Sequence, residues 1–379
     1  MYFLLKVFCL STESVLTTTH PGKIPQIKSA SLKLRIGIVY DQPEDYEVDN
    51  GPPDRFAEFE PESTIEVMEQ AITVAGHQPV RIGPPHRLLR SNHEVDLVWN
   101  IGEGYGTRNR EAWTPVLCEM RGIPILGSDA YTLTVTLDKV LTKQIARNLG
   151  IPVADWTVIS DWNTPKHRTS GSNSEKYDPG SGFTHTKQSG SDIPPADLPL
   201  PLFLKPRYEG TSKGITENSV VHTPEQFREQ CRHILVTYDQ DVMAETFLSG
   251  AELTCAMAYH PLKALPVVER GLHRSGIGSH AVQSLSNHDV HTSDALTPHL
   301  EEQITMWSIR LAEALEIRDY ARCDFKLDES GNPYFLEVNP LPTFALDSTY
   351  AILAELQDMP YPEFLSGILC DGIRRLRSD

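Results

Sequence analysis

The stretch Tyr320–Pro340, YARCDFKLDESGNPYFLEVNP, predicts two strands joined by a tight turn. The turn is formed by DESGN, residues 328–332, whose residue types favour tight backbone reversals. The first strand alternates, with an apolar set expected on one face and a polar set on the other: Ala321, Cys323, Phe325 and Leu327 against Arg322, Asp324 and Lys326. The stretch therefore reads as a β-hairpin with one polar face.

The register of this hairpin predicts which polar side chains meet. If Asp328 faces Pro333 across the turn, two facing pairs follow: Asp324 with Glu337, and Arg322 with Asn339. On the second strand we expect one face to carry Phe335, Glu337 and Asn339.

Two carboxylates that face each other across strands repel. A hard divalent cation between Asp324 and Glu337 would turn that repulsion into coordination, with Asn339 as a neutral oxygen ligand. Such oxygen ligands suit Mg²⁺ better than zinc or copper. The hairpin therefore predicts a magnesium site; the alternative is an exposed hairpin whose acidic residues face water.

The composition limits the classes of function. The chain of 379 residues is long enough for two or three domains, and its 40% hydrophobic and 22% charged residues are typical of a globular protein. The net charge of −17 argues against binding to nucleic acid or to an anionic membrane. Any phosphate-binding site must then be a local basic pocket.

The cysteines and the N-terminus bear on the compartment. The six cysteines lie far apart and include no CxxC, which favours reduced thiols in a cytoplasmic protein. The first ten residues, MYFLLKVFCL, are too short to span a bilayer and precede no clear cleavage site. We expect residues 1–31 to form a disordered leader.

Strands and helices alternate over residues 32–128, which predicts an α/β domain with a parallel sheet. Its first helix is expected to begin at a capping box, Ser63 with Glu66, and to end at Gly76. A second unit, 129–247, begins with a helix over 136–149. Its Ser-, Gly- and Pro-rich segment 163–199 cannot offset its chain entropy by burial, so we expect a flexible insertion.

The last unit, residues 248–379, contains the hairpin and is expected to be of the α+β class. It begins with strands over 252–258 and 265–269. A long loop, 271–298, and a helix over 300–315 lead into the hairpin, and a helix over 362–376 ends the chain.

The segment Phe203–Gly214, FLKPRYEGTSKG, is a strand that runs into a glycine-containing loop. Gly210 and Gly214 let the backbone approach a ligand closely, and successive backbone N–H groups can then cradle phosphate oxygens. Lys205 at the strand end adds positive charge. The segment is not a P-loop, and an ordinary turn is the alternative.

Two further groups have the chemistry of a nucleotide site. Asp138 and Lys139 open a helix, and Glu245, Phe247 and Glu252 lie at and beyond a strand end. Carboxylates can accept hydrogen bonds from an exocyclic amine or a ribose hydroxyl, while an aromatic ring offers apolar cover. Solvated surface charges would explain each group taken singly.

The order of these residues along the chain resembles the ATP-grasp superfamily, and within it the D-alanine–D-alanine ligase family. The resemblance covers about Leu34 to Leu356, without the insertion. It implies a three-domain ATP-grasp fold, in which 32–128 is a Rossmann-like pre-ATP-grasp domain and two ATP-grasp subdomains follow, over 129–247 and 248–379. It also implies ATP and Mg²⁺, with Mn²⁺ as the alternative metal.

The resemblance assigns roles to residues at matching positions. Nucleotide binding falls to Lys139, Lys205, Glu209, Gly210, Gly214, Ile215, Glu245, Phe247, Leu248 and Glu252. Metal binding falls to Asp324, Glu337 and Asn339. Catalysis falls to Arg322 beside an acyl phosphate, with Thr211 and Ser212 of the glycine loop.

The acceptor half departs from the family pattern. The family's histidine-containing glycine loop is replaced by WNIGEGYGTRNREA, which ends in Glu111 and Ala112, and Thr343 stands where the family has glycine. His273 and Arg274 occupy the region of a Tyr–Lys pair. We take Glu111, Thr343 and Ser348 as substrate-binding candidates.

The resemblance implies an acid–amino-acid ligase that forms an amide bond through an acyl phosphate. Such an enzyme would act on small amino acids or peptides in the cytoplasm, in cell-wall peptidoglycan biosynthesis if it makes D-alanyl-D-alanine; a homodimer stays open. Two alternatives are a ligase for a different amino-acid or peptide pair and a non-catalytic nucleotide-binding regulator.

Overall fold

A computed structural model describes residues 25–27, 33–47, 51–90, 94–160, 187–188, 198–270 and 296–378. The predicted leader, 1–31, and the predicted insertion, 163–199, lie mostly outside these residues, and so does the loop with His273 and Arg274.

The N-terminal part of the chain folds around a parallel sheet, as predicted. Its strand order is β2-β1-β3-β4. The elements are β1 (Arg35–Val39), α1 (Glu62–Val74), β2 (Gln78–Gly83), α2 (Pro85–Arg90), β3 (Leu97–Asn100), α3 (Trp113–Arg121) and β4 (Ile125–Leu126). The expected capping box is wrong: α1 begins after Pro61, so Ser63 lies inside the helix and caps nothing.

The central part has a mixed sheet of order β6-β5-β9-β7-β8. Its elements are α4 (Ala130–Leu137), α5 (Lys139–Asn148), β5 (Trp156–Ile159), β6 (Lys187–Gln188), β7 (Leu202–Pro206), β8 (Val220–Val221), α6 (Pro224–Thr237) and β9 (Val242–Thr246). The single helix expected over 136–149 is wrong. Asp138 is extended and ends α4, and its carboxylate caps α5 by accepting from the backbone N–H groups of Val140 and Leu141 at 3.1 and 3.2 Å.

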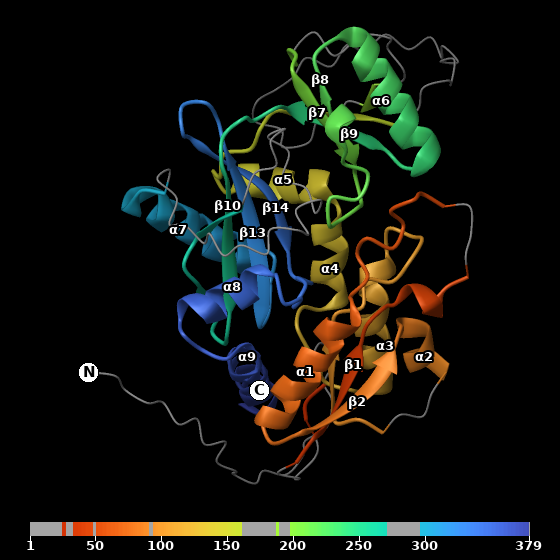
Figure 1. The fold of residues 1–379 in the computed structure, drawn as a ribbon, viewed down its shortest axis with the longest axis vertical. Coiled ribbons are helices and arrows are strands. Elements are labelled where there is room, and N and C mark those ends of the chain that lie inside the picture. The colour runs from red at the N-terminus through yellow and green to blue at the C-terminus, as the bar shows by residue number, and fades with distance from the viewer. Residues whose placement is uncertain are drawn as a thin grey trace.

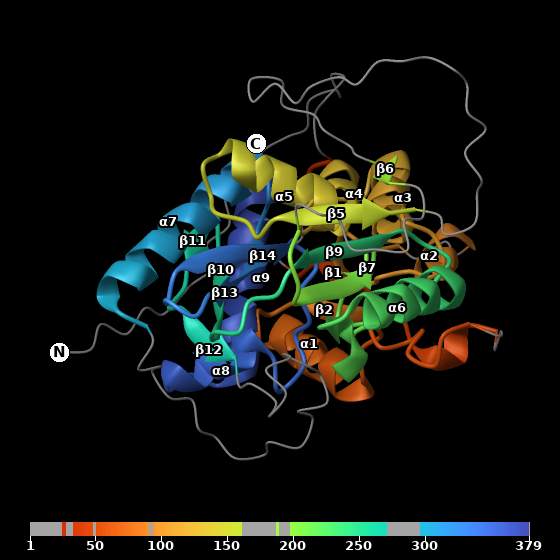
Figure 2. The same ribbon diagram turned by 90° about the horizontal axis from the view of Figure 1, so that it is seen from above.

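The C-terminal sheet has the order β11-β10-β13-β14, with β12 also paired to β10, and its pairs are antiparallel. Its elements are β10 (Glu252–Ala258), β11 (Lys263–Ala264), β12 (Val268–Arg270), α7 (Pro298–Ala314), β13 (Tyr320–Leu327), β14 (Pro333–Asn339), α8 (Thr349–Leu356) and α9 (Tyr361–Ser378). Figure 1 shows the central sheet above this one and α9 running beside α1, and in Figure 2 the strands β5, β9 and β7 lie beside β14.

The N-terminal and C-terminal parts share one hydrophobic core. The rings of Trp99 on β3 and Phe344 after β14 lie 5.7 Å apart. The buried Tyr320 hydroxyl lies 3.2 Å from two N-terminal backbone carbonyls, those of Asn100 and Leu126. The central sheet has a hydrophobic core of its own. The N-terminal and C-terminal parts therefore pack together as one unit, and the central sheet forms another.

The predicted hairpin forms, and its two critical pairs are confirmed: Asp324 faces Glu337, and Arg322 faces Asn339. Leu327, rather than Asp328, pairs with Pro333, and a register shift after Asp324 leaves Leu336 as an extra residue. Such a bulge changes the direction of the side chains beside it.

The expectation that Phe335 shares a face with Glu337 is therefore wrong. Phe335 is fully buried and lies against Phe325 on the core side, with ring centroids 5.9 Å apart. The bulge instead lets the neighbours Leu336 and Glu337 line the same pocket.

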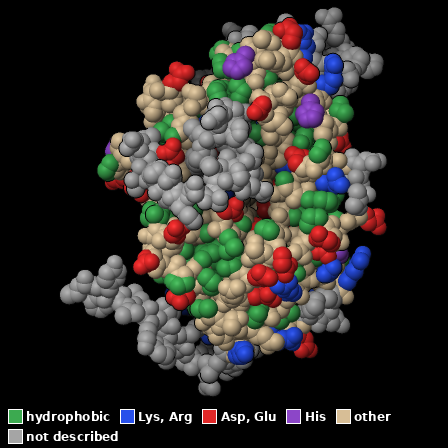
Figure 3. Space-filling model, viewed as in Figure 1, with side chains coloured by type: hydrophobic (Ala, Val, Ile, Leu, Met, Phe, Trp, Pro, Cys, Tyr) green, Lys and Arg blue, Asp and Glu red, His purple; other side chains and the backbone are tan. Residues whose placement is uncertain are grey.

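On the face drawn in Figure 3, Lys and Arg side chains are interspersed with Asp and Glu, so the described residues form no broad basic area there. All cysteines in the described part of the chain are free thiols. Among the described residues, no helix combines the length and apolarity that crossing a bilayer requires.

Arg375 on α9 should stabilise the packing of this helix against the N-terminal part of the chain. Its guanidinium binds the carboxylate of Asp319 at 2.6 and 2.7 Å, and that carboxylate also accepts from the Gly127 N–H at 2.8 Å. Because Arg375→Met would leave Asp319 buried without its cation, we expect a loss of about 3–5 kcal/mol in unfolding free energy, measured in urea.

The neighbouring Arg374→Met is the matched control, because the Arg374 side chain is 61% exposed. It should cost about 1 kcal/mol or less. Equal losses in the two variants would contradict the role of the Asp319–Arg375 pair.

Candidate active site

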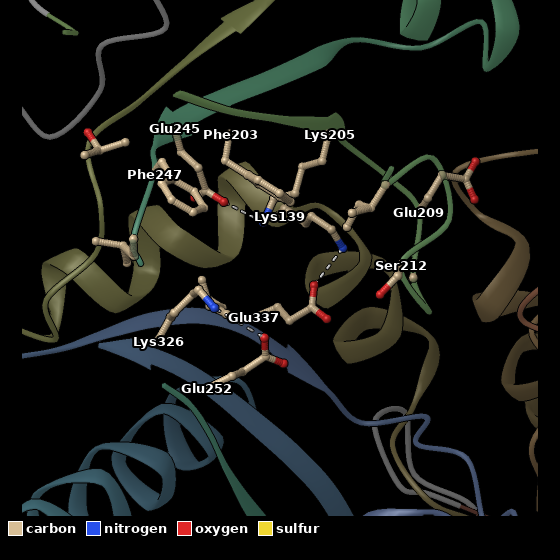
Figure 4. Close-up of a pocket in the computed structure, with 15 residues that line it drawn as sticks. Lys139, Phe203, Lys205, Glu209, Ser212, Glu245, Phe247, Glu252, Lys326 and Glu337 are labelled. Atoms are coloured by element: carbon tan, nitrogen blue, oxygen red, sulfur yellow. Dashed lines mark ion pairs between the residues drawn. The ribbon is translucent and has the colours of Figure 1, made fainter. Parts of the chain in front are cut away.

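A pocket lies between the central and C-terminal sheets. Its empty volume is about 770 Å³, including the open solvent space at its mouth. Figure 4 shows Phe247 toward one end, Ser212 and Glu209 toward the other, and Lys139 with Glu337 between them. Its lining is Lys139, Phe203, Lys205, Glu209, Gly210, Ser212, Ile215, Glu245, Thr246, Phe247, Leu248, Glu252, Lys326, Leu336 and Glu337. Most of the residues expected to bind nucleotide thus come together.

The central sheet contributes a buried cluster of one glutamate and two lysines. The carboxylate of Glu245 on β9 lies 2.7 Å from Lys205 Nζ on β7 and 2.8 Å from Lys143 Nζ on α5. Burial by itself would raise the pKa of Glu245, but the two ammonium groups lower it to about 2. Glu245 is therefore ionised at neutral pH, while burial lowers the pKa of Lys143 below its usual value.

Lys139 joins the two sheets across the pocket. It is the first residue of α5, and its Nζ lies 3.0 Å from Glu337 Oε2 on β14. Burial opposes the charge of Glu337, yet Lys139 and Lys205 lower its pKa to about 2. Lys139 and Lys205 thus bring two positive charges to the middle of the pocket.

The predicted metal ligands are adjacent on the hairpin but already bound to other side-chain or backbone groups of the protein. Asp324 is 2% exposed, lies 3.0 Å from Arg322 Nε and accepts from the Thr254 hydroxyl at 2.8 Å. Asn339 Oδ1 accepts from the Leu341 N–H at 2.9 Å.

Among the described residues, no group of three or more His, Cys, Asp and Glu side chains could hold a metal ion. The predicted set has two carboxylates and one amide oxygen, Asp324, Glu337 and Asn339. These hard oxygen donors fit Mg²⁺ or Mn²⁺, with further oxygens left to a nucleotide and water.

The glycine loop is held by carboxylates of the N-terminal part. The Gly210 N–H donates to Glu58 and the Gly214 N–H donates to Asp54, both at 2.7 Å. Thr211 and Ser212 adopt φ of 48° and 57°, which is uncommon for side chains with a Cβ. Of these two, Ser212 lines the pocket and Thr211 does not.

The loop that replaces the family's histidine loop carries a group of shielded carboxyls. Glu111 is 7% exposed and lies 4.0 Å from Arg110, whose guanidinium binds Glu58 at 2.6 Å. Burial, only partly opposed by Arg110, raises the pKa of Glu111 to about 7. Burial and the nearby Glu111 also raise the pKa of Glu103.

The other two substrate candidates have clear partners in the structure. The Thr343 hydroxyl donates to Glu60 at 3.0 Å. Ser348 caps α8 by accepting from the Ala351 N–H, and its hydroxyl lies 3.1 Å from that of Tyr361. Ser348 therefore has a structural role, and a substrate role stays a prediction for all three candidates.

Several site residues were not predicted. Phe203, Thr246, Lys326 and Leu336 line the pocket, and Lys143 and Glu58 hold its parts in place. Lys143 could have been found, because it lies one helical turn after Lys139. Glu58 gives no such signal, since it reaches the glycine loop from 152 residues away in sequence.

Two stacked sheets that enclose a pocket with lysines from one side and a carboxylate hairpin on the other define an ATP-grasp fold. The family model described as "D-ala D-ala ligase C-terminus" matches residues 181–370, half of the chain. The chain belongs to the D-alanine–D-alanine ligase family.

Individual relatives are distant. An uncharacterised protein of Sinorhizobium fredii, y4sG, is 28% identical over 305 residues, which are 78% of this chain and 79% of the relative. The D-alanine–D-alanine ligase of Desulfotalea psychrophila is 28% identical over 274 residues, 72% and 77% of the two chains. The crystal structure of the Bacillus anthracis D-alanine–D-alanine ligase complexed with ATP has a TM-score of 0.63 at 20% identity, and covers 90% of this chain and 98% of that one.

The raised pKa of Glu111 predicts a pH-dependent stability difference. As the pH rises from about 4.5 to about 7, the unfolded chain loses this proton before the folded chain does, so unfolding becomes more favourable. Glu111→Gln removes that penalty and should be more stable than wild type at pH 8, by at most about 3 kcal/mol. Denaturant unfolding at pH 5 and pH 8 measures the difference.

At pH 5 the two proteins should be nearly equal in stability. The exposed Glu119→Gln on α3 is the control and should follow wild type at both values. A Glu111→Gln variant that is less stable than wild type at pH 8 would contradict the assignment.

Proposed function

We propose that this protein is an ATP-dependent carboxylate–amine ligase. ATP would convert a substrate carboxylate into an acyl phosphate, and an amine would then displace phosphate to form an amide bond. The observation that carries this proposal is one pocket that joins three lysines, a glycine loop and Glu337 of the carboxylate hairpin. Membership of the D-alanine–D-alanine ligase family supports it.

The shape of the pocket suits a nucleotide laid along it. At one end Phe247 and Leu248 can cover the adenine, where Glu245 would accept from its exocyclic amine. Glu252 would accept from the ribose hydroxyls. Lys139 and Lys205 would then meet the phosphates, which point toward the glycine loop.

Phosphoryl transfer needs positioning and charge neutralisation more than covalent help from the protein. The positive side chains at the site include Lys139, Lys205, Lys326 and Arg322. A divalent cation held by Asp324, Glu337 and Asn339 would supply further positive charge to the transferred group. Arg322 would then face the oxyanion that develops when the amine attacks.

The substrate pair is where we expect this chain to differ from its named relatives. Thr343 hydrogen-bonds Glu60, and Glu103 and Glu111 form a shielded carboxyl pair in the loop that departs from the family pattern. These carboxyls would suit the ammonium group of an amino acid. D-alanine is one candidate substrate, and a different amino acid or a small peptide is the other.

An ADP-release assay tests the proposal. Protein, ATP and Mg²⁺ are combined with single and paired D- and L-amino acids and dipeptides. We expect ADP release that requires one particular substrate pair and stops on chelation by EDTA. ATP binding without release for any substrate would instead favour the nucleotide-binding regulator.

Asp324→Asn keeps the volume of the side chain and an acceptor for Thr254, but it removes the negative charge beside the buried Arg322, so urea unfolding must first establish that the variant folds. We expect it to lower kcat about 100-fold or more, since the site loses one metal-binding carboxylate. Steady-state ADP release measures the change. Glu329→Gln in the exposed turn of the same hairpin is the control, and a similar loss of activity in that control would contradict a specific role for Asp324.

A further inference from the structure

Lys143 is a lysine with no contact to solvent, and it is not among the residues that line the pocket. Its ammonium group lies 2.8 Å from Glu245 Oε2 and donates to the backbone carbonyl of Phe335 at 3.1 Å. Burial of an ammonium group is costly unless it neutralises a nearby charge. The cost of burying Lys143 must therefore be offset by a favourable interaction of its ammonium group.

The charges around Glu245 identify that interaction. Its carboxylate has one negative charge and contacts two ammonium groups, those of Lys143 and Lys205. Of the two lysines, only Lys205 lines the pocket. If Lys143 were absent, Glu245 and Lys205 would form a neutral pair, and a phosphate would have to compete with a buried carboxylate for Lys205.

We propose that Lys143 is a positioning residue that neutralises Glu245 and so leaves the charge of Lys205 available to nucleotide phosphates. The inference rests on the proposed nucleotide site and deepens it. Lys143 acts through Glu245 and does not touch the ligand. Its bond to Phe335, beside the bulge of β14, also fixes α5 against the C-terminal sheet.

Lys143→Met tests the proposal with two ligands that differ only in phosphate. We expect the Kd of ADP to rise about tenfold or more, the size typical of a weakened contact to a charged group. The Kd of adenosine should change less than about twofold, because it has no phosphate. Isothermal titration calorimetry measures both.

Lys263→Met is the control for a change of overall charge, because Lys263 is exposed on β11. It should bind both ligands as wild type does. Unchanged ADP binding in Lys143→Met, or equal losses for ADP and adenosine, would overturn the proposal, since a merely structural defect would affect both ligands.

A double variant keeps the test valid if Lys143→Met does not fold. Once Glu245→Gln has removed the negative charge, Lys143 has nothing to neutralise. Lys143→Met added to Glu245→Gln should then change the Kd of ADP less than about threefold, and a tenfold change there would overturn the proposal.

These measurements do not depend on turnover. A wild-type protein that binds ADP but shows no ligase activity would overturn the proposed function and leave the role of Lys143 in place. A wild-type protein that binds neither ADP nor ATP would overturn both.

Discussion

Two lysine–glutamate pairs, one within the central part and one across the pocket to the C-terminal sheet, are the interactions on which the rest of the site depends. Lys139 on α5 reaches Glu337 on β14, while Lys143, one turn later, binds Glu245 and the backbone of β14. Lys143 and Glu245 are shielded from water, where an unpaired charge would be costly, while the Glu337 side chain is 30% exposed. The same contacts therefore fix the spacing of the sheets and place positive charge where phosphates would lie.

The hairpin β13–β14 forms the wall of the pocket opposite the central sheet, and the bulge in β14 gives this wall its lining. A regular strand would turn Leu336 and Glu337 to opposite faces, but the bulge lets both line the pocket. The core shared by the N-terminal and C-terminal parts supports that wall, and Glu58 of the N-terminal part reaches the glycine loop. All three parts of the chain thus contribute to one site.

Much of this arrangement was predictable because it follows from short-range patterns. Alternation in β13 predicts the face of Arg322 and Asp324. The predicted pairing of Asp324 with Glu337 is correct although the assumed turn is one residue out of register, because the bulge at Leu336 compensates for that error. The bulge at Leu336 was not predictable, since no glycine or proline marks it, and so Phe335 was placed on the wrong face. The break between α4 and α5 is not apparent in the sequence, because Asp138 can lie in the first turn of a helix as well as cap one. Glu58 and the edge-to-face contact of Trp99 with Phe344 join segments far apart in sequence, which periodicity cannot reveal.

Transfer of a carboxylate oxygen to phosphate is the most direct test of the proposed chemistry. Amino acids labelled with ¹⁸O in the carboxyl group are incubated with the protein, ATP and Mg²⁺, and the released phosphate is analysed by mass spectrometry. An acyl phosphate predicts phosphate that carries one ¹⁸O from the substrate whose carboxylate is activated. Release of ADP with only unlabelled phosphate would contradict the proposed ligase chemistry.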